Sequence, residues 1–164
     1  MAEYKVAIYW QLDDGADFLK SRYSRGHSWA FDGGINVPAS SSPHVVPLPM
    51  SVEEAVDPEE AFIASAASCH MLWFLSIAAG KGFVVKEYVD DAVGVMGKNS
   101  DGKLAVTSIT LSPKTRFEGQ RTPTPPELES LHRSAHEKCF IANSIKSEIH
   151  CRPSILPAAS QTKK

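Results

Sequence analysis

Residues 57–82, DPEEAFIASAASCHMLWFLSIAAGKG, are the stretch that decides the fold. Asp57 offers an N-cap carboxylate, Pro58 fits the first helical position and Glu60 occupies the third, a pattern typical of a helix start. Two glycines near residue 80 mark the end of the same helix. Residues 61–79 contain no formally charged side chain. The stretch therefore predicts a long α-helix that is apolar on every side.

A helix of this length and apolarity could also span a membrane, so two interpretations compete. Three serines, Cys69 and His70 interrupt the apolar surface, and no second hydrophobic segment follows in the sequence. The rest of the chain is predicted to form strands, which need an apolar surface to cover. We therefore interpret the segment as a central core helix and expect no membrane association.

The whole chain has the composition of an ordinary globular protein, with 164 residues, 43% hydrophobic and 22% charged. We expect one domain over residues 1–152 and a flexible tail over residues 153–164. The net charge of −2 gives no support for a nucleic acid or an anionic membrane as partner. The N-terminus lacks the pattern of a secretory signal, and three cysteines are too few for a disulfide framework. A cytoplasmic protein is the expectation.

Strands are predicted on both sides of the central helix. They are residues 4–12, 22–31, 83–97 and 103–117, with a short strand near residues 146–151. Residues 35–49 are rich in proline and serine and predict a surface loop with a short extended piece near Val45 and Val46. Asn99–Gly102 predicts a hairpin connection between the two long strands.

A second helix is predicted to start at Pro126 and to run to about Ile145. Its apolar residues recur at helical spacing: Leu128, Leu131, Ala135, Cys139 and Ala142. Cys139 should therefore face inward. The order of strands, helix, hairpin and helix predicts an α+β fold with an antiparallel sheet. A long apolar helix is hard to bury within so short a chain, so we expect an intertwined homodimer in which two copies cover each other's central helices.

Cys69 is the first candidate for chemistry, although free cysteine is often only a buried space filler. Burial in the middle of a helix raises the pKa of a thiol, so a reactive Cys69 requires a nearby cation. Arg25 is the candidate, because it shares a predicted strand face with Tyr23 and His27, and an arginine that faces a core needs an anionic partner. An arginine whose head reaches solvent at the sheet edge is the alternative.

Glu59 and Cys139 complete the candidate set. Glu59 either complements the helix dipole or positions Arg25. It precedes Cys69 by ten residues, roughly 15 Å along a straight helix, so it would act through Arg25, within the chain or across a dimer interface. Cys139 can meet Cys69 if the two helices pack, and two facing thiols suit a peroxidatic and a resolving residue. Cys151 receives no role.

A metal site is the main chemical competitor. His132, His136 and Cys139 share one helical face at i, i+4 and i+7, and His70 and His150 each adjoin a cysteine. The sequence contains no CxxC or HExxH spacing, and histidines are often plain surface residues. The pattern therefore does not favour zinc, and we expect no metal.

These residues together resemble the OsmC/Ohr family, the osmotically inducible and organic hydroperoxide resistance proteins. The resemblance rests on residues 57–71, DPEEAFIASAASCHM, and is supported by residues 135–144, AHEKCFIANS. It implies an intertwined α+β homodimer whose antiparallel sheets wrap around two central helices. It also implies thiol-dependent reduction of organic hydroperoxides, and of hydrogen peroxide as a further substrate, without a metal or bound cofactor.

By position, Cys69 resembles the peroxidatic residue of the family and Cys139 the resolving residue. Glu59 resembles the glutamate that holds the catalytic arginine, for which Arg25 is the candidate. The hydroperoxide-specific members usually carry proline after the second cysteine, whereas Phe140 follows it here. That departure indicates an OsmC-like subgroup.

The implied mechanism begins with Arg25 stabilising the Cys69 thiolate, which attacks the peroxide. Cys139 then closes a disulfide, and an external dithiol, for which lipoylated proteins or small thiols are suited, restores both thiols. Two other classes stay open: acyl transfer or hydrolysis by Cys69 with His70 or His27, and non-catalytic binding of an apolar ligand. Adjacent helical residues point about 100° apart, so Cys69 and His70 form a poor nucleophile–base pair.

Overall fold

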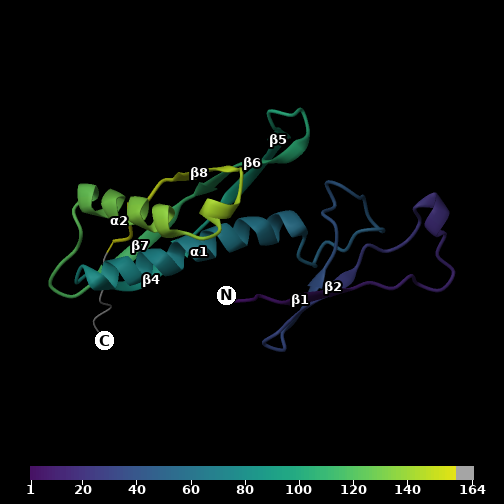
Figure 1. Cartoon of the computed structure of the whole chain (residues 1–164), viewed down its shortest axis with the longest axis horizontal. Coiled ribbons are helices and arrows are strands. Elements are labelled where there is room, and N and C mark those ends of the chain that lie inside the picture. Colours follow the sequence, from purple (N-terminus) through teal and green to yellow (C-terminus); the bar gives the residue numbers. More distant parts are fainter. Residues whose placement is uncertain (158–164) are drawn as a thin grey trace, which may run out of the picture. The chain divides into compact units, whose positions relative to one another are not determined.

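The computed structural model describes residues 1–157, which fold into helices and short strands in an α+β arrangement (Figure 1). The chain divides into two compact units, residues 1–61 and the residues from 62 onward. The boundary falls in the first turns of the long helix α1.

The strands and helices have the following bounds. The strands are β1 (Val6–Tyr9), β2 (His27–Phe31), β3 (Asn36–Ala39), β4 (Val84–Asp90), β5 (Val93–Lys98), β6 (Leu104–Leu111), β7 (Pro113–Glu118), β8 (Glu148–Cys151) and β9 (Ser154–Ile155). The α-helices are α1 (Pro58–Gly80) and α2 (Pro125–Lys138), and 3-10 turns occur at Phe18–Lys20 and Ala142–Ser144. The strand orders are β1-β2-β3, β4-β7-β9 and β5-β6-β8. The predicted antiparallel pairing is confirmed for the hairpins, whereas β8 and β9 pair in parallel with β6 and β7.

The first unit is a three-stranded antiparallel sheet in which two predictions of local structure were wrong. The strand predicted over residues 22–31 starts only at His27, because Ser24 Oγ accepts from Gly26 N and the Arg25 N–H donates to Met50 O instead of to a strand. Val45 and Val46 lie in a turn, where both N–H groups donate to Ser42 O. The extended piece lies earlier, in β3, an edge strand that tolerates a proline.

The helix α1 begins and ends where the sequence predicted. Glu60 N donates to Asp57 Oδ1 at 2.7 Å, and Asp57 N donates to Glu60 Oε2 at 3.4 Å. Gly82 has φ 78°, a conformation that favours glycine after a helix end. The buried residues of α1 recur every four positions: Ala66, His70, Phe74 and Ala78. Among the helices of residues 1–157, α1 is long and apolar enough to cross a membrane, a property that core helices of soluble proteins share.

The second unit packs α1 and α2 against a hairpin that bends in the middle. Each predicted long strand is divided in two, and at the bend Ser112 N donates to Asp90 Oδ1 at 2.6 Å. The larger hydrophobic core consists of Phe74, Ala78, Phe83, Leu128, Leu131 and Ala135. The helix α2 ends at Lys138, earlier than predicted, because Asn143 Nδ2 donates to the carbonyls of Glu137 and Cys139, both at 3.0 Å.

The end of the chain is partly ordered by strand pairing. Ser154 and Ile155, which we placed in the tail, form β9 on β7, and Leu156 N donates to Thr115 O at 2.9 Å. The rest of the expected tail, residues 158–164, lies outside the described residues. The single domain over residues 1–152 and the homodimer stay predictions.

Candidate active site

Cys69 lies half-buried in the middle of α1 and borders a cavity of about 590 Å³. Leu72 and Trp73 follow Cys69 on the same helix face because residues three and four apart are neighbours. Phe140 and Ile141, which follow α2, close the other side. Leu72 is 60% and Phe140 67% exposed, so the wall is apolar and open to a molecule from solution. The cavity can accept an organic group beside the sulfur.

Cys139 is fully buried directly after α2, and Cys69 lies near enough to act on the pKa of its thiol. Burial raises the pKa of Cys139 to about 11, and the neighbouring Cys69 acts in the same direction. The Ala142 N–H lies 3.4 Å from the Cys139 sulfur and opposes this shift. The inward position expected from helical spacing is thus observed, and the two cysteines are in contact.

The segment after α2 holds Cys139 in place through its backbone. Asn143 N donates to Cys139 O at 3.1 Å, and Ser144 Oγ donates to Phe140 O at 2.7 Å. The Phe140 ring meets Trp73 edge-on at 5.5 Å between ring centroids. Lys138 Nζ lies 5.5 Å from the centre of the Trp73 ring, so a cation rests against the cavity wall.

Trp73 and Lys138 belong to this site and were not predicted from the sequence. The spacing of Cys69 and Trp73, four residues apart on one helix, was a usable signal for the aromatic wall. The place of Lys138 was harder to foresee, since it depends on where α2 ends.

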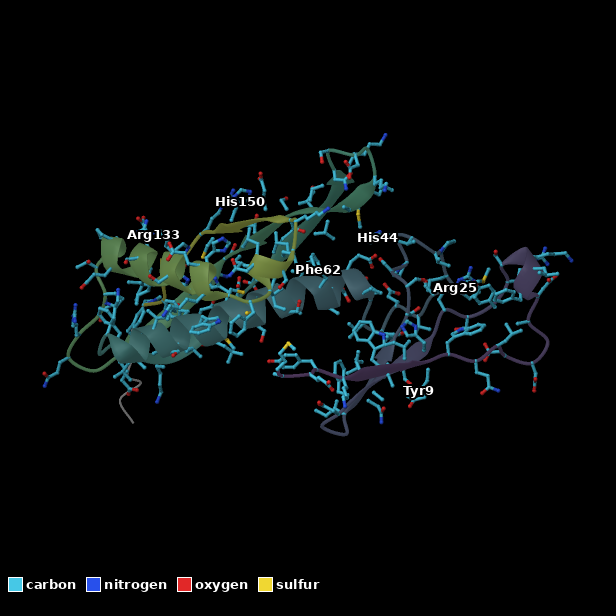
Figure 2. All side chains as sticks on the ribbon, viewed as in Figure 1. Tyr9, Arg25, His44, Phe62, Arg133 and His150 are labelled. Carbon is cyan, nitrogen blue, oxygen red and sulfur yellow. The ribbon has the colours of Figure 1, made fainter. Side chains whose placement is uncertain are left out.

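Arg25 lies in the first unit, in an irregular segment instead of on the predicted strand face (Figure 2). Its Nη1 donates to Ser21 O at 2.9 Å and to Tyr23 O at 2.5 Å, and its guanidinium lies 3.7 Å from the centre of the Tyr23 ring. It borders an aromatic cavity of about 490 Å³ with Trp10 and Phe18. Within residues 1–157, no carboxylate forms an ion pair with Arg25. Its pairing with Cys69, a residue of the other unit, stays a prediction.

Glu59 is half-buried in the first turn of α1. The glutamate that accepts from the backbone at the helix start is its neighbour Glu60, which accepts from the Asp57 N–H. Across the described part of the chain, Glu59 forms no ion pair. Its role as a partner of Arg25 therefore stays a prediction.

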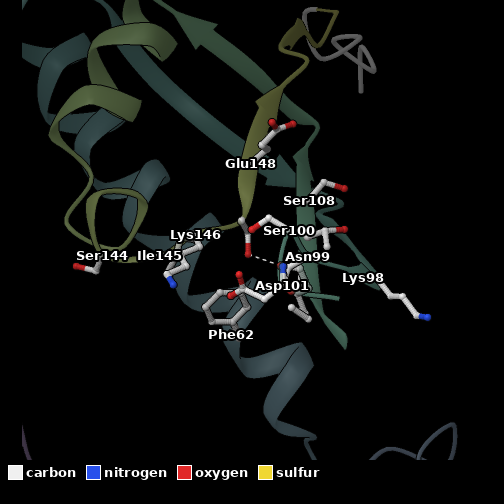
Figure 3. A pocket seen from close by; sticks show the side chains of 14 residues that line it. Phe62, Lys98, Asn99, Ser100, Asp101, Ser108, Ser144, Ile145, Lys146 and Glu148 are labelled. Atoms are coloured by element: carbon white, nitrogen blue, oxygen red, sulfur yellow. Dashed lines mark hydrogen bonds between the residues drawn. The ribbon is translucent and has the colours of Figure 1, made fainter. Parts of the chain in front are cut away.

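The helical set His132, His136 and Cys139 is not brought together as one group of ligands. Cys139 contacts Cys69, while His132 Nδ1 lies 2.9 Å from His70 Nε2 in the core. A larger cavity of about 720 Å³ lies elsewhere in the second unit, and Figure 3 shows Phe62 of α1, Asp101 of the β5–β6 connection and Lys146 around it. The described residues that line it include neither cysteine nor histidine.

The sequence matches a known protein family. The family model for OsmC-like protein matches residues 51–154, well over half of the sequence. The chain belongs to the OsmC-like family. The resemblance expected from the sequence is confirmed. All three cysteines and Glu59 of this OsmC-like protein lie in the matched range, whereas Arg25 precedes it.

Solved structures agree with this assignment. An OsmC-like protein of unknown function from Vibrio cholerae O1 biovar eltor is 51% identical, with a TM-score of 0.92 over 94% of this chain and 100% of that chain. The organic hydroperoxide resistance protein OhrB of Bacillus subtilis is 15% identical, with a TM-score of 0.61 over 94% and 98%. An organic hydroperoxide resistance protein OsmC from Legionella pneumophila is also 15% identical, with a TM-score of 0.60 over 96% and 100%. The last two show the shared α+β fold. None of the curated proteins compared matches the chain.

Proposed function

We propose that this OsmC-like protein is a thiol peroxidase that reduces organic hydroperoxides, with Cys69 as the peroxidatic and Cys139 as the resolving residue. The observation that supports it most is the contact between the two thiols beside an apolar cavity. Attack on a peroxide needs a sulfur that the substrate can reach, and Cys69 is half-buried at the cavity. Disulfide closure needs a second sulfur in contact with the first, and Cys139 meets that need.

The reaction proceeds in three steps. The Cys69 thiolate attacks the distal peroxide oxygen, the O–O bond breaks, and the leaving alkoxide takes up a proton to become an alcohol. Cys69 is thereby oxidised to a sulfenic acid. The Cys139 sulfur then attacks Cys69, water leaves, and the disulfide forms. An external dithiol reduces the pair back to two thiols and is itself oxidised to a disulfide.

We assign to Cys139 a second function in this scheme, as a hydrogen-bond donor to the Cys69 sulfur. A thiol that donates toward the attacking sulfur stabilises negative charge there. Since the pKa of Cys139 is raised to about 11, it stays a protonated donor at neutral pH. The same proton leaves in the water that disulfide closure releases.

Arg25 and Glu59 complete the proposed site. Nη1 of Arg25 donates both of its hydrogen bonds within the first unit. We assign the two remaining donor atoms, Nε and Nη2, to the peroxide and to Glu59. The homodimer belongs to the same proposal, because exposed apolar side chains such as Tyr9 and Val93 suit coverage by a second copy. A cytoplasmic location fits, because lipoylated proteins or small thiols there would supply the external dithiol.

The test is peroxide consumption with cumene hydroperoxide as substrate and dihydrolipoamide as reductant. Cys69→Ser should abolish turnover, since no sulfenic acid can form. Cys139→Ser should still form a sulfenic acid on Cys69, which dimedone traps, but should not form the intramolecular disulfide. Ala79→Ser, an exposed substitution on the same helix, serves as the control and should keep the wild-type rate.

Mass spectrometry of peroxide-treated protein should map a Cys69–Cys139 link. Full hydroperoxide reduction by Cys69→Ser would contradict the proposal. An acyl-enzyme on Cys69, formed with an activated ester and hydrolysed by the protein, would instead assign an acyl-transfer activity. His70 is a poor candidate for the base of such an acyl transfer, because its Nε2 is hydrogen-bonded to His132 in the core.

A further inference from the structure

Three potential metal ligands from three separate elements converge in the second unit. They are His70 of α1, His132 of α2 and Cys151 at the end of β8, and their ligand atoms all lie within 4.8 Å of one another. We propose that these residues bind one divalent transition-metal ion of the zinc class. The site is distinct from the Cys69–Cys139 pair and does not depend on peroxide reduction.

The distances are close to those of a tetrahedral zinc site. With bond lengths of about 2.1 Å to nitrogen and about 2.3 Å to sulfur, two nitrogens on one ion lie about 3.4 Å apart, and a nitrogen and a sulfur about 3.6 Å. Here His70 Nε2 lies 2.9 Å from His132 Nδ1 and 3.8 Å from Cys151 Sγ. The His132–Cys151 pair lies within 4.8 Å, so its ligand atoms must approach by up to about 1.2 Å while the two nitrogens separate by about 0.5 Å, changes that side-chain rotations can make.

The two imidazoles are costly to bury for packing alone. His70 is 1% and His132 2% exposed, and their rings stack at 5.2 Å between centroids. Within residues 1–157, His70 Nδ1 and His132 Nε2 have no hydrogen-bond partner. Two neutral rings share a single N–H···N bond, so apolar side chains would fill this volume at lower free energy. A ligand set for a cation explains why two ring nitrogens and a thiol face one another.

Binding is a ligand exchange without oxidation or reduction. Cys151 loses its proton to solvent, and its sulfur bonds to the ion. The proton in the His70–His132 bond moves to another nitrogen of its own ring, so both ligating nitrogens carry lone pairs. One proton is released per ion bound.

The site has a path from solution and candidates for the fourth ligand. A cavity of about 230 Å³ borders both His132 and Cys151. Glu129 and His136, one turn before and one turn after His132 on α2, line the same cavity. Either side chain or a water molecule can complete a tetrahedral set.

The test uses the full chain, reduced and stripped of metal with a chelator, and Co²⁺ as a spectroscopic probe. Wild-type protein should bind one Co²⁺ per chain, with the intense visible absorption of a tetrahedral ion and a thiolate-to-cobalt charge-transfer band in the near ultraviolet. It should release one proton per ion, and Zn²⁺ should displace the Co²⁺. Cys151→Ser should lose the charge-transfer band and weaken binding on the order of 100-fold.

Cys69→Ser and Cys139→Ser are the matched controls, and both should keep the wild-type cobalt spectrum. A band that disappears in either of these variants and persists in Cys151→Ser would place the metal at the dithiol and overturn the proposal. A wild-type protein that binds Co²⁺ without a thiolate band would also overturn it, and this measurement needs no variant to fold.

Discussion

Gly94 of β5 lies so close to α1 that a side chain there must displace Ile63. A Cβ added at this position would lie 2.3 Å from Ile63 Cδ1 and 2.7 Å from Ile63 Cγ1, with Val106 Cγ1 at 3.3 Å. Contacts below 3 Å require one side chain to leave its rotamer or the backbone to move. Gly94→Ala therefore tests how tightly the helix that carries Cys69 is seated on its sheet.

We expect Gly94→Ala to lower the free energy of unfolding by about 1–3 kcal/mol, the usual range for overpacking. In an Ile63→Ala background the clashing atoms are gone, so the same substitution should cost less than about 0.5 kcal/mol. The difference between the two costs is the coupling energy of the pair, and it should exceed about 1 kcal/mol. Urea unfolding followed by circular dichroism measures all four proteins, and equal m-values validate the comparison.

The control is Gly33→Ala, since an added Cβ there has no atom within 4 Å among the described residues. It should change the free energy of unfolding by less than about 1 kcal/mol, and a small gain is the expected sign. Our account of this contact fails if Gly94→Ala is as stable as wild type, or if its cost is the same with and without the Ile63 side chain.

Three further predictions concern stability. Leu131→Ala empties a fully buried core position and should cost about 2–5 kcal/mol in urea unfolding; a loss below 1 kcal/mol would mean that the core collapses around the gap. Asp57→Ala removes the acceptor of the Glu60 N–H at 2.7 Å and should cost about 1 kcal/mol, whereas an unchanged midpoint would assign the cap to another group. Burial raises the Cys139 pKa from 9.0 to about 11, so the folded state holds the thiol proton more tightly than the unfolded state does. This contribution to the free energy of unfolding is present below pH 9 and lost as the pH rises through 11. Between pH 8 and 11, wild type should therefore lose about 2 kcal/mol more than Cys139→Ala, and parallel pH profiles would refute this.

The sequence predicted α1 well because both of its ends are specified by contacts within a few residues. Asp57 and Glu60 exchange hydrogen bonds three positions apart, and Gly82 supplies a positive φ after the last turn. The end of α2 was placed too late, because it depends on an asparagine beyond it. Asn143 Nδ2 donates to the carbonyls of Glu137 and Cys139, which in a longer helix would accept from backbone N–H groups.

The segment around Arg25 could not be predicted from alternation. Its polar and aromatic residues alternate as in a strand, yet the Arg25 N–H donates to Met50 O, and Ser24 bonds the backbone of Gly26. A strand requires a partner, and the pattern of one segment does not show whether a partner is present. Arg25 therefore lies on no strand face in this structure, although it borders an aromatic cavity.

The two cysteines of the candidate site were predictable, and the metal ligands were not. Cys69 lies in the middle of the apolar helix α1, and Cys139 directly follows α2 on the continuation of its apolar stripe, so the packing of α1 against α2 brings them near each other. His70 lies 62 residues from His132 and 81 from Cys151, so only the packing of α1, α2 and β8 unites them. Spacing along one helix instead selected His136 and Cys139 as companions of His132.

Cys69 and His70 are neighbours in sequence but belong to different groups, because successive residues of a helix point about 100° apart. Cys69 borders the apolar cavity and contacts Cys139, while His70 is buried against His132. Each group therefore contains one residue of α1 and one residue of α2 or directly after it, yet the two groups share no side chain. Peroxide turnover that fails in Cys69→Ser and a cobalt band that fails in Cys151→Ser would be two independent losses, so each proposal can be refuted while the other stands.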